Sequence, residues 1–144
     1  MSRHSAGLDL TPWVPSSAPA LVMVRAGLLV PTEILDAGER LATWFGLVAR
    51  ARWGMSPFGG EARHPVWEQV NPRRFLRGAN DCAPAAAAFR VAYEVPQVSR
   101  MAVGASTAEH LAQLVATTPL DADHNRIAQY RSLLRARAVR TEAN

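Results

Sequence analysis

The chain of 144 residues contains no lysine, because all 16 of its basic side chains are arginines. A mechanism that needs a lysine as base, proton relay or Schiff-base nucleophile therefore cannot be run by this chain alone. The single cysteine, Cys82, excludes an internal disulfide and does not supply the cysteine cluster of a zinc site. Such sparse use of cysteine is typical of a reducing compartment, so we expect a cytoplasmic protein.

Long apolar runs and an export signal are also missing. No stretch reaches the roughly eighteen apolar residues that cross a bilayer, and no apolar segment follows Met1-Ser2-Arg3-His4. We therefore expect neither a membrane partner nor a signal peptide. At 49% hydrophobic residues, the chain still has enough apolar side chains for the core of one domain.

The formal net charge of +4 raises the question of a nucleic-acid partner. Five arginines crowd the C-terminal segment, at positions 126, 131, 135, 137 and 140. They alternate, however, with Ile127, Leu133 and Leu134, which is typical of the apolar stripe of a packed helix. The charge is therefore attributed to the surface of a helix, and no nucleic-acid partner is expected.

Apolar segments at three places predict buried parallel strands, over residues 20–25, 47–52 and 98–103. Helical patterns alternate with them, over residues 31–46, 84–94 and 107–117, and a last helix over 121–137 has Asp121 as its cap. This alternation implies right-handed crossovers and an α/β fold. Three parallel strands leave edges and one face uncovered, so the sheet needs another chain or belongs to a larger barrel.

Two further segments lie outside this pattern. The polar stretch from residue 61 to 82 predicts a long loop, and residues 1–19 an irregular arm ahead of a domain over 20–144. Arginines at 73, 74 and 77 are either phosphate ligands or solvated loop residues. Asp81 beside Cys82 suggests a nucleophile, but no histidine is in register to activate the thiol.

Turns rich in small residues follow the second and third strands. The first is Ser56-Pro57-Phe58-Gly59-Gly60, and the second is Gly104-Ala105-Ser106, after which Thr107 is expected to cap a helix. Glycine lets backbone amides approach a ligand closely, and helix N-termini attract phosphate. These turns therefore predict a phosphate site, the alternative being an ordinary turn and a plain helix cap.

In order and spacing, these segments resemble the C-terminal half of the aldo-keto reductases, which are (β/α)₈ barrels that use a nicotinamide cofactor. Residues 22–29 are similar to the family's sixth strand, Ser56–Gly60 to its Ser-Pro-Leu-Gly-Gly turn, and residues 103–111 to the end of its eighth strand and the next helix. The resemblance covers roughly residues 20 to 137. It implies half of a TIM-type barrel, with three parallel strands alternating with helices and a C-terminal helix.

The resemblance also implies NADP as cofactor. Its pyrophosphate would face the first turn, at Ser56, Phe58, Gly59 and Gly60. Its adenosine ribose and 2′-phosphate would face Gly104, Ala105, Ser106 and the helix that follows, where His110 stands in place of the family's usual arginine.

Several positions depart from the family pattern. The catalytic Tyr, Lys, Asp and His come from the missing half of the barrel, and Met23, Met55 and Leu114 replace residues that usually contact the cofactor. One hypothesis is therefore the cofactor-side half of a split NAD(P)-dependent carbonyl reductase, inactive alone. Such a half needs a complementary half-barrel chain or self-association, and its substrate would be a small carbonyl compound. The other hypothesis is a non-catalytic interaction or scaffold protein derived from a half barrel.

Overall fold

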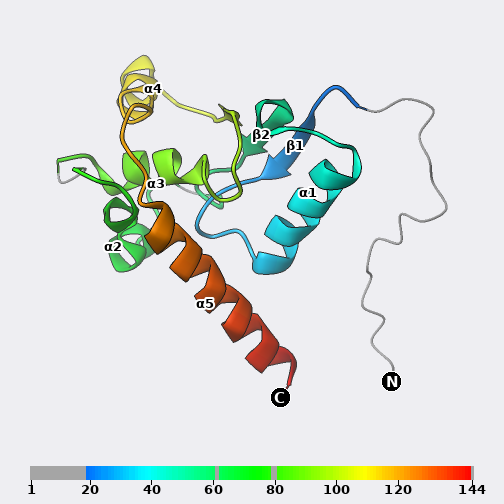
Figure 1. The fold of residues 1–144 in the computed structure, drawn as a ribbon. Helices are drawn as coiled ribbons and strands as arrows, with labels where there is room; N and C mark the ends of the chain where they lie inside the picture. The colour runs from blue at the N-terminus through cyan, green and yellow to red at the C-terminus, as the bar shows by residue number, and fades with distance from the viewer. Residues whose placement is uncertain (1–18, 61, 79–80, 144) are drawn as a thin grey trace.

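The computed structural model describes residues 19–60, 62–78 and 81–143 (Figure 1). Three short parallel strands form one sheet in the order β1 (Val22–Arg25), β2 (Arg52–Met55) and β3 (Arg100–Ala102). Helices lie between successive strands, and a long helix follows the last of them. The expected α/β fold, with three parallel strands alternating with helices and a C-terminal helix, is confirmed.

Three of the five helices in the described residues lie close to where the sequence placed them. The helices are α1 (Thr32–Trp44), α2 (Val66–Val70), α3 (Pro84–Ala92), α4 (Ala108–Val115) and α5 (His124–Glu142). Helices α1, α3 and α4 match the expected positions. Thr107 caps α4 as expected, because its hydroxyl accepts a hydrogen bond from the His110 amide at 3.1 Å.

The predicted second strand over residues 47–52 is wrong by about five residues, since β2 begins only at Arg52. Gly46 ends α1 with a positive φ of 66°, and the Leu47 amide donates back to the Ala42 carbonyl at 2.8 Å. A 3₁₀ turn over Ala49–Ala51 then leads into the strand. The first half of this apolar run therefore completes the end of a helix rather than a strand.

The prediction of a structureless loop over residues 61–82 is also wrong. This segment contains α2 and a 3₁₀ turn over Pro72–Phe75, and it buries Trp67, Phe75 and Leu76 in the main core. Each element is too short to show a helical period, so a few large apolar side chains carried the only signal.

Helix α5 begins at a different cap from the one predicted. The side chain of Asp123, not that of Asp121, accepts a hydrogen bond from the Arg126 amide at 3.1 Å. An antiparallel bridge between Leu76 and Ala122 keeps the preceding residues extended, so the helix cannot start earlier.

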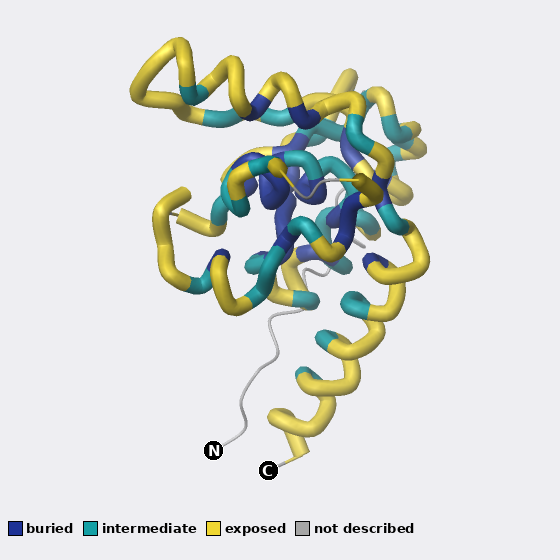
Figure 2. The backbone as a smooth tube through the Cα atoms, turned by 90° about the vertical axis from the view of Figure 1, so that its left-hand side faces the viewer, coloured by how far each residue is buried: buried dark blue, intermediate teal, exposed yellow. Residues whose placement is uncertain are grey.

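The first turns of helix α5 pack against the rest of the protein, and the helix is mostly exposed beyond them (Figure 2). Of the predicted apolar stripe, Ile127 is buried and Leu134 is half-buried, but Leu133 is 67% exposed. Ion pairs with α1 also hold this part of the helix, at 2.7 Å between Arg131 and Glu39 and 2.9 Å between Arg135 and Asp36. The hydrogen bond from Arg135 lowers the pKa of the Asp36 carboxyl.

The helices cover one face of the sheet. Val24 is buried against Gly38 of α1, where an added Cβ would lie 3.0 Å from its side chain. Met101 of β3 packs in a small cluster with Phe89 of α3 and Leu114 of α4. Side chains alternate along a strand, so the neighbouring residues point to the opposite side.

That opposite side, which we term the open face, consists of two cross-strand rows: Met23–Trp53–Arg100 and Arg25–Met55–Ala102. Met23 is 43% exposed and Met55 is 36% exposed. The other four residues are exposed or half-buried. Within the described residues, the expectation of an uncovered sheet face therefore holds.

Candidate functional site

The two small-residue turns lie side by side at the carboxyl end of the sheet. The first follows β2 and the second follows β3, and the carboxyl ends of neighbouring parallel strands meet at the same edge. Such an edge is where α/β proteins commonly bind their ligands. The fold therefore brings together two segments that are more than 40 residues apart in the sequence.

A cavity of about 500 Å³ lies between the two turns. It is lined by Met55, Ser56, Pro57, Phe58, Gly60, Ala102, Val103 and Gly104. A second cavity of about 380 Å³ adjoins it, since Phe58 and Gly104 line both. The second cavity also contains Ala105, Ser106 and His110. Seven of the eight predicted site residues thus line this pair of cavities.

Gly59 is the exception. A Cβ at this residue would lie 3.0 Å from the Leu29 side chain, and its backbone has a left-handed φ of 64°. Its amide donates a hydrogen bond to the Ser56 carbonyl at 3.0 Å. This glycine therefore shapes the turn and packs against the body of the protein. The expectation that it leaves room for a cofactor pyrophosphate is not supported by this geometry.

Gly104 differs in every one of these respects. A Cβ there would meet no atom within 4 Å, and its φ is not in the left-handed region. Among the described residues, the amides of Gly104, Ala105 and Ser106 donate no hydrogen bond to another protein group. Three neighbouring backbone donors are thus left beside a cavity, an arrangement that suits an anion.

Two helices start at the smaller cavity. Ala83, Ala85 and Ala86 line it from the beginning of α3, and Ser106 and His110 line it from the beginning of α4. The positive ends of both helix dipoles therefore favour negative charge there. The small alanine side chains of α3 leave the space between the two helices open.

Polar side chains in the same cavity are few. The Ser106 hydroxyl lies 3.3 Å from Nδ1 of His110, and Arg63 also lines the cavity. Arg63 cannot be recognised from the sequence alone, because nothing in the segment from 61 to 82 marks one arginine among several. Glu109 lies in the first turn of α4 and adds a negative charge near the helix start.

The other arginines of that segment do not line either cavity. Arg73 donates to the Asn71 side chain and to the Cys82 carbonyl, both at 3.4 Å. Arg77 pairs with Asp121 at 3.3 Å at the surface. Arg74 is exposed, and its carbonyl accepts a hydrogen bond from Arg126. The side chains of Arg73 and Arg77 take part in structural contacts, and none of the three arginines lines the paired cavities, so their interpretation as phosphate ligands is not supported.

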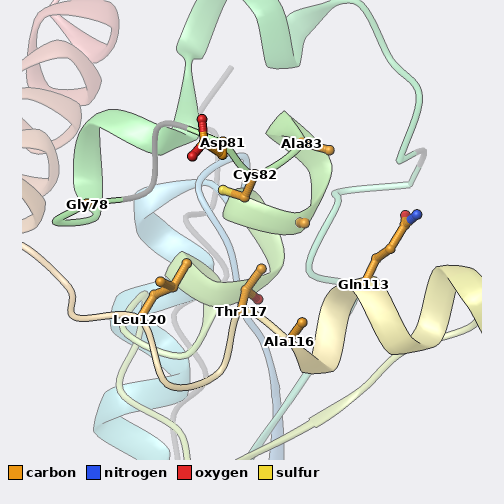
Figure 3. A pocket seen from close by; sticks show the side chains of 9 residues that line it. Gly78, Asp81, Cys82, Ala83, Gln113, Ala116, Thr117 and Leu120 are labelled. Atoms are coloured by element: carbon orange, nitrogen blue, oxygen red, sulfur yellow. The ribbon is translucent and has the colours of Figure 1, made fainter.

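A third cavity, of about 540 Å³, lies between the segment that enters α3 and the end of α4 (Figure 3). Cys82 and Asp81 line it on one side, and Gln113 and Thr117 on the other. Partial burial raises the pKa of the Cys82 thiol, which disfavours the thiolate a nucleophile needs. No histidine is among the lining residues. The nucleophile suggested by the sequence has no support here.

Neither tyrosine is placed to donate a proton in the paired cavities. The Tyr130 hydroxyl donates to the Leu28 carbonyl, and its ring packs on Phe75. Tyr93 packs edge-on against Phe89. Burial raises the pKa of both phenols. Both residues are therefore accounted for by packing.

Comparison with known proteins gives no relative. No family model, no curated protein and no solved structure matches the chain. In the part of the chain that the structure describes, no group of three or more His, Cys, Asp or Glu residues could hold a metal ion. None of the described helices is both long and apolar enough to span a bilayer.

Proposed function

We propose that this chain binds the phosphate-bearing part of NADP, as the cofactor-side half of an aldo-keto-reductase-like barrel. The observation that carries the proposal is the meeting of the two small-residue turns around adjoining cavities, beside three unpaired backbone amides. Phosphate oxygens would accept hydrogen bonds from Gly104, Ala105 and Ser106. The half-barrel class rests on the sequence resemblance and on the three-stranded parallel sheet.

The residues present fit the adenosine phosphate part of the cofactor better than the rest. His110 and Arg63 can add positive charge toward a 2′-phosphate, and the alanines of α3 leave space beside α4. Leu114 is buried in a small core cluster, and it offers no polar group to a base. Glu109 opposes an anion at the helix start, so we expect modest affinity.

Bound NADP would supply hydride chemistry, but this chain lacks the tyrosine–lysine pair with which the aldo-keto reductases move the proton that carbonyl reduction requires. It contains no lysine, and both tyrosines are held in packing contacts. We therefore predict that the isolated chain reduces no aldehyde or ketone. The measurement is NADPH oxidation monitored by absorbance with purified chain and a panel of carbonyl compounds. Turnover that depends on both chain and substrate would contradict the prediction.

Calorimetric titration with 2′,5′-ADP, with 5′-AMP as the comparison ligand, tests the binding proposal directly. In the proposed site, 2′,5′-ADP would contact only residues of this chain, so a missing half barrel does not affect the outcome. We expect the 2′-phosphate to strengthen binding to the wild-type chain. Equal or absent binding of both ligands, in the chain and in any complex that co-purifies with it, would overturn the proposal.

A non-catalytic interaction protein is the second candidate. It is favoured by the open face, where Met23 and Met55 remain exposed. It is also favoured by Leu114, a buried apolar residue at a position where the aldo-keto reductases usually have a cofactor contact. Failure of the nucleotide titration together with a stable protein complex would support this alternative.

A further inference from the structure

The open face combines apolar side chains with positive charge. Met23, Trp53, Met55 and Ala102 supply apolar surface, and Arg25 and Arg100 supply the only charges in the two rows. The Arg100 guanidinium lies 5.2 Å from the centre of the Trp53 ring, in a cation–π contact. Exposed thioethers and an aromatic ring framed by arginines are typical of a protein interface.

This surface runs directly into the candidate site. Met55 and Ala102 belong to the open face and also line the cavity of about 500 Å³ between the two turns. A molecule that covers the open face would therefore lie against one wall of that cavity. Met55 and Ala102 are both exposed, so no other described part of the chain covers this wall.

A second copy of the chain fits this surface poorly. Two open faces packed together would bring Arg25 and Arg100 of one copy toward the same cations of the other. Neither row contains an acid to neutralise them. Like charges placed against each other in an interface strongly disfavour association.

Single-stranded nucleic acid also fits poorly. Such ligands stack their bases on open aromatic rings. Trp53 is the only aromatic residue of the open face, and Arg100 already lies over its ring. Methionine side chains supply no stacking surface.

We propose that the open face binds a different protein, one that presents carboxylates among apolar side chains, and that this protein closes the cavity at Met55 and Ala102. Closure of the cavity by this partner rests on the proposed function, whereas the docking itself does not. Carboxylates would pair with Arg25 and Arg100 while apolar groups cover Met23 and Met55.

A charge-reversed copy of this chain is the probe. The Arg25→Glu, Arg100→Glu double variant keeps the apolar side chains and presents carboxylates in place of guanidinium groups. In sedimentation velocity, we expect an equimolar mixture of wild type and variant to form a 1:1 complex at about 50 mM salt. That complex should weaken at least about tenfold at about 500 mM salt, whereas wild type alone should not associate at low salt.

A matched control carries the same charge change elsewhere. The Arg137→Glu, Arg140→Glu variant alters the exposed end of α5 and should form no complex with wild type. Thermal unfolding followed by circular dichroism checks that each variant folds. If the double variant does not fold, Arg25→Glu alone is used and should give the same salt dependence with a smaller effect.

Four other outcomes would overturn the proposal. Wild type that dimerises at low salt as tightly as the mixture would identify a second copy as the occupant. Binding of a dT20 oligonucleotide that charge reversal abolishes would identify nucleic acid. A mixed complex that forms only after removal of residues 1–18 would assign the face to that segment of the chain. No complex in any mixture would show that the face is not a docking surface. A mixed complex without nucleotide binding would contradict the proposed function alone.

Discussion

The two turns at the edge of the sheet look alike in sequence, yet they differ in what their glycines do. In and beside Ser56–Gly60, the fold requires glycine. The backbone φ is positive at Gly27, Gly59 and Gly60, and Gly27 and Gly59 are also closely packed. A Cβ at Gly27 would lie 2.7 Å from the Pro57 carbonyl oxygen, and one at Gly59 would crowd Leu29. At Gly104 neither constraint exists. A glycine with no structural requirement, beside a cavity, is the stronger indication of a ligand.

The largest expected effect comes from Gly27→Ala, which should destabilise the fold by about 3 kcal/mol or more. Gly27 has a φ of 134°, and its new methyl group would strike the backbone of the first turn. Gly60→Ala is the matched control, since its φ is 133° and nothing lies within 4 Å. Urea unfolding measures the difference between the two variants. Equal destabilisation would show that the contact with Pro57 is unimportant.

Gly59→Ala should cost about 2 kcal/mol, part from backbone strain and part from Leu29. Gly78→Ala separates the two contributions, because Gly78 has a similar φ of 70° and an open surrounding, against 64° at Gly59. The same unfolding measurement applies, and Gly59→Ala should lose more stability than Gly78→Ala. If Gly59→Ala were as stable as the wild type but had lost nucleotide affinity, Gly59 would instead belong to the binding site.

Gly104→Val should change stability by less than about 0.5 kcal/mol while weakening 2′,5′-ADP at least about tenfold. The valine side chain would occupy the space in front of the three amides without straining the backbone. Ala112→Val, at an exposed position of α4, is the control and should bind 2′,5′-ADP as the wild type does. Unchanged affinity in Gly104→Val would show that the amides beside Gly104 do not bind the nucleotide.

His110→Ala should have the smallest effect, a loss of about 1 kcal/mol or less in 2′,5′-ADP binding. The imidazole is only partly buried and lies beside Ser106, so water competes for any charge contact with phosphate. The amide of residue 110 would still donate to Thr107, so the helix cap remains. Calorimetry at two salt concentrations checks the value. A loss larger than that of Gly104→Val would reverse the order of the backbone and side-chain contributions.

Local sequence was enough to determine several features of this protein. The apolar run at β1, the alanine-rich α3 and the cap at Thr107 each depend on neighbouring residues, and each was found where expected. The alternation of strands and helices likewise determined the α/β class, because right-handed crossovers leave little choice of topology. The two small-residue turns were visible from their glycines and serines alone.

Tertiary structure decided the rest, because burial depends on residues far away in the sequence. Trp67 became core through contacts that no local period reveals, and the bridge between Leu76 and Ala122 moved the start of α5. Arg63, rather than its neighbours, lines the candidate cavity. Only the packed structure separates Gly59, pressed on Leu29, from Gly104, which faces open space, since φ and neighbouring atoms are set by the whole fold.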